Sequence, residues 1–201
     1  MLNPTLFAKT ASLALIAAGT ALVGQGVWIG AKAEIAQALL ARAWARAIDG
    51  ESAPTPWPWA DTWPVARLSV PDLGEHAIVL AEAGGEALAF GPSLLTASAT
   101  PGEPGISVIA AHRDTHFRFL QHVEPGQTVI IERTDAPPLA FRVTGSEIVE
   151  AARSGIETGN GGPARLALVT CWPFDAVTPG PLRYVVWAEP AGDLQTAGLH
   201  P

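Results

Sequence analysis

The first 48 residues carry two apolar patterns typical of helices. Residues 11–31 read ASLALIAAGTALVGQGVWIGA and contain no charged side chain. Roughly 20 such residues span a hydrocarbon core at about 1.5 Å rise per residue. Residues 32–48 are rich in Ala, Leu and Arg, and their apolar positions recur at helical spacing. We therefore predict a membrane anchor over 1–31 and an amphipathic helical stalk over 32–48.

The apolar segment has a second interpretation, a cleaved signal peptide. Residues 31–33 (AKA) resemble a signal cleavage site, but the apolar stretch is longer than a signal sequence usually needs, which favours an uncleaved anchor. Charge weighs against export of the C-terminal part, because Lys9 precedes the segment whereas Lys32 and two arginines follow it. By the positive-inside rule that distribution does not favour an outward-facing C-terminal domain.

The pattern changes to short apolar runs after a linker. Residues 49–64 (DGESAPTPWPWADTWP) hold four prolines, which exclude a helix. Beyond them, short runs with alternating or β-branched residues are separated by Gly, Pro and Asp, and we predict strands at 66–70, 77–80, 87–90, 106–112, 128–133, 139–149, 165–170 and 182–188. So many short strands over 65–190 predict a mainly β domain, a closed barrel or a sandwich, followed by a tail over 191–201.

Composition narrows the function. The chain has 201 residues, enough for one such domain. Its net charge of −7 and its 12 scattered basic residues argue against a nucleic-acid-binding surface. Cys171 is the only cysteine, so no internal disulfide forms and the core must hold the fold. In an exported chain an unpaired thiol is a liability unless it has a function, although a buried structural Cys remains an alternative.

Three polar side chains stand at the ends of predicted apolar strands. His112 ends the run SVIAAH, Cys171 ends RLALVTC, and Arg183 opens RYVVWA. A thiolate is a competent nucleophile once a base has taken its proton, and an imidazole can take that proton and later give one to a leaving amine. A guanidinium, which stays protonated, can stabilise the oxyanion that develops meanwhile. These three groups together predict nucleophilic catalysis by cysteine.

The motifs around these residues resemble the signature of the sortase family. The chain has HRDT at 112–115, LVTC at 168–171 and Arg183 twelve positions after Cys171. Ala167 stands where the family usually has Thr, and Ala111 stands where Gly is common before the histidine; neither change removes a reacting group. PWPWADTWPVARL, LAFGP and TCWPFDA are further similar to the Gram-negative branch, the class GN sortases.

This resemblance implies a fold, a role for each catalytic residue, a reaction and a cellular location. It implies an eight-stranded β-barrel in which Cys171 is the nucleophile, His112 its acid/base partner and Arg183 the oxyanion-side cation. The implied reaction cleaves an LPxTG-like sorting signal of a substrate protein between Thr and Gly and passes the acyl group, through a thioacyl-enzyme, to an amine acceptor. The resemblance also implies no cofactor and no metal. It places the chain in the inner membrane as a single-pass protein, with the catalytic domain facing the periplasm.

Three further residues near these groups are predicted to contact or orient the substrate. Thr170 precedes the nucleophile and can orient it through its hydroxyl or backbone. Trp172 follows the nucleophile and either lines the groove or packs in the core as most tryptophans do. His116 is predicted to line the groove or lie on the surface.

Three alternatives remain open at this point. A hydrolytic cysteine peptidase would use the same groups with water as the acceptor. A metal-dependent hydrolase would use His112, Asp114 and His116, because alternate residues of an extended strand share one face and could converge on zinc or iron. A noncatalytic, membrane-tethered binding module would carry Cys171 as a structural residue.

Overall fold

The computed structural model describes residues 4–81, 87–156 and 161–193, which form two compact units. The first ends at Ala38 and the second begins at Leu39, so the long helix α1 (Pro4–Ile48) belongs to both. The strands, all in the second unit, are β1 (Pro64–Val70), β2 (Glu75–Ala81), β3 (Ser93–Leu94), β4 (Ile106–Ala110), β5 (Thr128–Glu132), β6 (Leu139–Glu150), β7 (Arg165–Cys171) and β8 (Leu182–Asp193). Short 3-10 turns occur at Pro71–Leu73 (η1), Ala87–Ala89 (η2), Arg118–His122 (η3) and Ala151–Arg153 (η4).

The first unit is a helix with exposed apolar side chains. Leu13, Ile16 and Leu22 are each more than half exposed. By length and composition alone, the stretch Leu15–Ile48 can cross a membrane, and a signal sequence near an N-terminus meets the same criterion. The described apolar side chains Leu13, Ile16 and Leu22 are therefore not covered by protein in this unit.

The last turns of α1 belong to the second unit and are amphipathic. Leu40 is fully buried in a small cluster with Leu80 of β2 and Ala87 of η2. Ala43 and Ala47 are buried on the same helical face, as residues three to four positions apart must be. The helix ends at Ile48, and Gly50 adopts a left-handed φ of 95°, which suits a residue without a Cβ just past a helix end.

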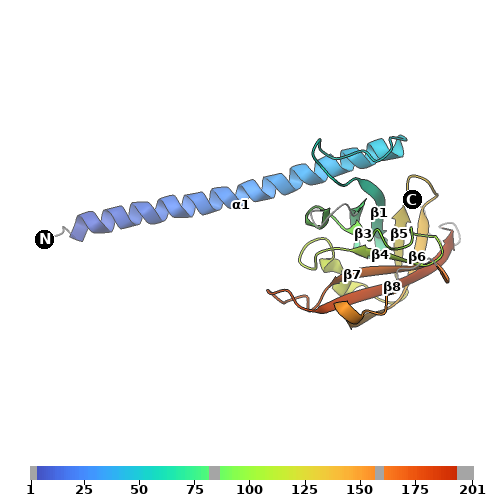
Figure 1. Cartoon of the computed structure of the whole chain (residues 1–201). Coiled ribbons are helices and arrows are strands. Elements are labelled where there is room, and N and C mark those ends of the chain that lie inside the picture. Colours follow the sequence, from blue (N-terminus) through green and yellow to red (C-terminus); the bar gives the residue numbers. More distant parts are fainter. Residues whose placement is uncertain (1–3, 82–86, 157–160, 194–201) are drawn as a thin grey trace. The chain divides into compact units, whose positions relative to one another are not determined.

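The eight strands close into a barrel in the order β1-β2-β3-β4-β7-β8-β6-β5 (Figure 1). Most neighbours are antiparallel, but β4 and β7 run parallel, and so do β2 and β3. The mainly β, closed eight-stranded barrel expected from the sequence is thus confirmed.

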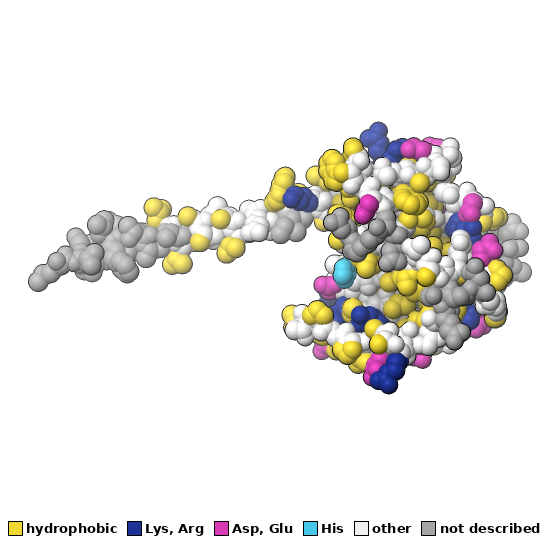
Figure 2. Space-filling model, in the orientation of Figure 1, with side chains coloured by type: hydrophobic (Ala, Val, Ile, Leu, Met, Phe, Trp, Pro, Cys, Tyr) yellow, Lys and Arg dark blue, Asp and Glu magenta, His cyan; other side chains and the backbone are white. Residues whose placement is uncertain are grey.

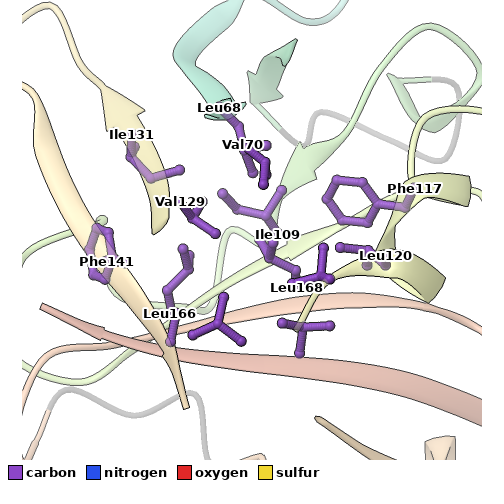
Figure 3. Packing of buried hydrophobic residues seen from close by; sticks show 14 of the residues in the cluster. Leu68, Val70, Ile109, Phe117, Leu120, Val129, Ile131, Phe141, Leu166 and Leu168 are labelled. Carbon is purple, nitrogen blue, oxygen red and sulfur yellow. The ribbon is translucent and has the colours of Figure 1, made fainter. Parts of the chain in front are cut away.

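Alternation along the strands separates an inner from an outer face. Leu166 and Leu168 of β7 belong to the main core, together with buried residues from β1, β4, β5, β6 and the η3 region (Figure 3). Ala167 packs instead with Val108 and Val185 in a separate cluster. Because successive side chains of a strand point to opposite faces, these two clusters lie on opposite sides of the β4-β7-β8 sheet.

The surface of the barrel carries mixed charge. Among the described residues of the face drawn in Figure 2, basic and acidic side chains lie next to one another and neither sign forms a stripe. Arg67 and Glu132 pair across β1 and β5 in this way, with 2.6 Å between Nη2 and Oε1. The described charges of that face therefore do not form an extended region of one sign.

Several predicted strand limits differ from the structure, and two of the differences lie near the residues singled out from the sequence. Residues 87–90 do not form a strand: Ala87–Ala89 is a 3-10 turn, and the short strand β3 follows it. Gly91 accounts for the shift, because a Cβ there would lie 2.9 Å from the carbonyl oxygen of Ile78, so the chain passes β2 too closely for most residues. The second error is at β4, which ends at Ala110 rather than His112, because the chain turns so that the Phe117 amide donates to the His112 carbonyl at 3.0 Å.

We expect Leu168→Ala to lower the free energy of unfolding by about 2–5 kcal/mol, because it opens a cavity in a fully buried part of the core. Val177→Ala is the matched control: Val177 is 99% exposed, and its truncation should change the free energy by less than about 0.5 kcal/mol. Urea denaturation of the full chain in detergent measures both. Equal effects of the two substitutions would contradict the assignment of Leu168 to the core.

Candidate active site

The three polar residues predicted from strand ends lie at one edge of the barrel. Ala110 of β4 aligns with Val169 of β7 in the parallel pair, and His112 follows two residues after Ala110. Cys171 of β7 lies directly opposite Arg183 of β8 in the antiparallel pair. The carboxyl ends of β4 and β7 and the amino end of β8 therefore meet, because parallel strands end at the same edge and an antiparallel strand begins there.

One cavity of about 170 Å³ is lined by all three of these residues. Its other walls are mainly apolar side chains or backbone, from Leu88, Ala110, Ala111, Val169 and Thr170. Cys171 is partly exposed and His112 is exposed, so both can be reached from solvent. A thiol, an imidazole and a guanidinium around one small cavity is the arrangement that acyl transfer through cysteine requires.

Thr170 connects the strand that carries the nucleophile to the strand that carries the histidine. Its hydroxyl is buried and donates to the Ala111 carbonyl at 2.8 Å. The Ala111 amide in turn donates to the Val169 carbonyl at 3.1 Å, which extends the β4-β7 ladder by one residue. The backbone immediately before His112 is thus joined to the backbone immediately before Cys171.

Arg183 is anchored through one of its nitrogens. Nη1 donates to the carbonyls of Gly180 at 2.9 Å and Leu182 at 2.8 Å. A guanidinium has five N–H donors, and in the described part of the chain Nη2 and Nε of Arg183 have no recorded partner. Those donors remain for a ligand, while the positive charge stays permanent.

His116 lies on the turn that follows His112 and is half-buried. Burial lowers the pKa of the His116 imidazole, and electrostatic repulsion between the two imidazoles when His112 also carries a proton lowers that pKa further. His116 is not among the residues that line the cavity of Cys171. Its predicted contact with substrate stays a prediction.

The metal alternative loses its geometric basis. It required His112, Asp114 and His116 to alternate along one strand, but β4 ends at Ala110 and these residues lie in a turn. Within residues 4–81, 87–156 and 161–193, no three His, Cys, Asp or Glu side chains gather closely enough to hold an ion. The residues do not fit a metal site, and we derive no step through a metal.

Trp172 belongs to an aromatic cluster on the loop after the nucleophile. It stacks on Tyr184 with ring centroids 5.6 Å apart, and Phe174 packs edge-on against both rings. These rings line a cavity of about 600 Å³ together with Arg118, Gln121, Pro173 and Asp175. The Trp172–Pro173 peptide bond is cis. Sequence reasoning did not single out Tyr184 or Phe174, although both lie within three positions of Arg183 or Cys171.

A second cavity was also missed from the sequence. It has a volume of about 270 Å³ on the outer face of β4, β7 and β8, and it shares Ala110, Val169 and Arg183 with the cavity of Cys171. Its remaining walls are largely apolar, from Leu95, Val108, Val149, Ala151, Ser154, Ile156 and Val185. The alternating apolar residues of the three strands were the available signal, but alternation alone does not show that part of this face is open.

Comparisons with known proteins agree on one family. A family model described as "Sortase domain" matches residues 68–191. Sortase D of Bacillus subtilis (strain 168) is 25% identical over 122 residues, which are 61% of this chain and 61% of that protein. The chain thus spans about three-fifths of the length of this relative.

Solved structures share the fold. Sortase A from Corynebacterium diphtheriae superposes with a TM-score of 0.61 at 20% identity, over 82% of this chain and 88% of that chain. A Clostridium perfringens Sortase D5 transpeptidase superposes with a TM-score of 0.57 at 17% identity, over 74% of this chain and 86% of that chain.

The lowered pKa of His116 predicts a pH dependence of stability. In the unfolded chain His116 binds a proton below its ordinary pKa of about 6.5, whereas in the folded chain it binds that proton only at lower pH. The free energy of unfolding therefore falls as the pH drops below about 6.5. We expect the melting temperature of the wild-type chain to fall more between about pH 7.5 and about pH 5 than that of His116→Gln. Parallel slopes for the two proteins would refute the coupling.

Proposed function

The chain belongs to the sortase family, and we propose that it is a cysteine transpeptidase that cleaves a sorting signal and transfers the resulting acyl group to an amine. The observation that carries this proposal is the single cavity lined by Cys171, His112 and Arg183. Sortases are cysteine transpeptidases, and the family match includes all three residues. The chemistry of each group assigns its role.

The first half of the proposed reaction forms a thioester. His112 takes the thiol proton, and Sγ of Cys171 bonds to the carbonyl carbon of Thr in an LPxTG-like signal. The carbonyl oxygen becomes an oxyanion, which the free donors of Arg183 stabilise. His112 then gives its proton to the departing glycine nitrogen, and the Thr–Gly bond breaks.

The second half transfers the acyl group. The acceptor amine attacks the thioester carbonyl, and His112 takes the proton that the amine releases. The C–S bond then breaks, an amide replaces the thioester, and the proton returns to the Cys171 sulfur. No oxidant or metal enters this sequence of steps.

Two further cavities suit the two substrates of such a reaction. We assign the apolar residues of the sorting signal to the 270 Å³ cavity, because its apolar walls continue from the cavity of Cys171. Trp172 lines the larger cavity, where an acceptor has room, and His116 is assigned to substrate contact from the turn beside His112. Thr170 orients the nucleophile through its backbone contact with Ala111. The acceptor is an amine on a lipid, a glycan or a protein.

The domain organisation and location are part of the proposal. Residues 1–31 serve as a single-pass anchor in the inner membrane, 32–48 as the stalk, 49–64 as a linker, 65–190 as the catalytic domain in the periplasm and 191–201 as a tail. The apolar stretch of α1 supports the anchor. The stretches PWPWADTWPVARL, LAFGP and TCWPFDA support the class GN branch.

Trapping of the intermediate tests the reaction itself. When the full chain is incubated with an LPxTG-like peptide, we expect mass spectrometry to detect the peptide's N-terminal acyl fragment on Cys171, since the thioester must precede transfer. Added small amines should convert this fragment to an amine-coupled product. Cys171→Ala, with an intact fold by circular dichroism, should give neither adduct nor product. Free acid as the sole product would favour the hydrolytic peptidase instead, and turnover by Cys171→Ala would reject the assignment.

Replacement of Arg183 by Lys tests the oxyanion role. Lysine keeps the charge but lacks the planar fork, so we expect acylation to slow by about 10- to 1,000-fold, comparable with loss of an oxyanion donor. His112→Ala should cost at least as much, because it removes the acid/base group. Arg142→Lys is the control, since the Arg142 side chain donates to the Gly126 carbonyl elsewhere on the barrel and lines no cavity described above. Rates near wild type in the Arg183 or His112 variant would contradict the assigned role.

A further inference from the structure

The strand pairing positions the backbone before His112 and Cys171, but both residues are followed by loops. Residues 111–117 turn after β4, and residues 172–181 connect β7 to β8. The Thr170–Ala111 hydrogen bond joins the residues immediately before His112 and Cys171, not the loops that follow them. The position of the His112 imidazole relative to the Cys171 sulfur therefore also depends on contacts between the two loops.

Arg113, the residue after His112, joins these two loops. Its Nη2 donates to the carbonyl of Ala176 and to the carbonyl of Thr178, the latter at 3.2 Å. Hydrogen bonds from a charged donor are stronger than those between neutral groups. The side chain is partly buried, and its Nη1 is buried with no hydrogen-bond partner in the described part of the chain. An arginine held this way is part of the loop packing rather than a solvated surface charge.

The loop after the nucleophile is held by two arginines through alternate carbonyls. Arg113 donates to the carbonyls of Ala176 and Thr178. Arg183 donates to the carbonyls of Gly180 and Leu182. The same loop begins at Trp172, the residue after Cys171, and the Trp172 amide donates to the Leu182 carbonyl at 3.1 Å. One backbone segment therefore contacts the neighbour of the histidine, the neighbour of the nucleophile and the oxyanion-side cation.

We propose that Arg113 is a positioning residue for the reaction: by binding the carbonyls of Ala176 and Thr178 it holds His112 in register with Cys171 and Arg183. This inference rests on the proposed function. Arginine suits the role because its planar group presents several donors in a fixed plane, whereas the lysine ammonium is a single point on a flexible chain. Displacement of a catalytic group by about 1 Å is enough to cost about 100-fold in rate, so a modest shift of the His112 turn has a large effect.

The test compares acylation by full-length Arg113→Ala with wild type in single-turnover experiments over a range of peptide concentrations. We expect the acylation rate at saturating peptide to fall by about 10- to 100-fold, while the peptide concentration for half-maximal rate changes by less than about threefold, because Arg113 does not line the proposed peptide cavities. Added guanidinium ion should restore at least about a third of the lost rate, since it can occupy the vacated space and donate to the same carbonyls.

Arg142→Ala is the matched control, because Arg142 also donates to a loop carbonyl, that of Gly126, on another part of the barrel. It should acylate at the wild-type rate and show no response to guanidinium. The inference is wrong if Arg113→Ala acylates within about twofold of wild type, if its defect lies in peptide affinity, or if guanidinium does not restore its rate.

Arg113→Lys provides a second variant in case Arg113→Ala does not fold. It should show a smaller fall in the saturating rate with unchanged peptide affinity, and a wild-type rate would overturn the requirement for the guanidinium plane. Failure of the proposed function is distinguishable, because the wild-type chain itself would then form no acyl adduct. Failure of the Arg113 inference leaves the wild-type chain fully active.

Discussion

The pairing of β7 with both β4 and β8 is the constraint on which the site depends. Because β4 runs parallel to β7, their carboxyl ends meet, and because β8 runs antiparallel, its first residues return to the same edge. A register shift of one residue in either ladder would turn Cys171 or Arg183 toward the core. Such a shift is unfavourable, because it would also move the buried apolar residues of these strands from the face on which they pack to the opposite face. Packing and chemistry are therefore specified by the same ladder.

The barrel and the three strand ends could be anticipated from sequence because they depend on local patterns. Short alternating apolar runs indicate strands whatever their neighbours are, and a polar residue at the end of such a run remains at an edge. The wrong prediction of a strand at residues 87–90 arises instead from a contact between residues that are distant in the sequence. LAFGP is apolar enough for a strand, but the close passage of Gly91 by the Ile78 carbonyl is a long-range contact that no local pattern contains.

The rest of the site was missed for the same reason. Tyr184 gave no signal of its own, and its place beside Trp172 follows from the pairing of Thr170 with Tyr184 across β7 and β8. The cavity lined by Val108, Val169 and Val185 gave no sequence signal either, because alternation shows on which face of a strand a residue lies but not whether another part of the chain covers that face. Here part of the outer face is left open as a cavity. Arg113 likewise reaches residues more than sixty positions away.

The loop between β7 and β8 is secured by its backbone, since both arginines that hold it bind carbonyl oxygens. At its start the side chains of Trp172 and Phe174 also pack against Tyr184, but residues 177–179 are exposed, and Val177, between two of the bound carbonyls, is almost fully so. Amino-acid exchanges at 177–179 can therefore accumulate over evolutionary time without disturbing the hydrogen bonds that hold the loop. A scaffold of this kind lets selectivity diverge among descendants while the reacting groups keep their geometry.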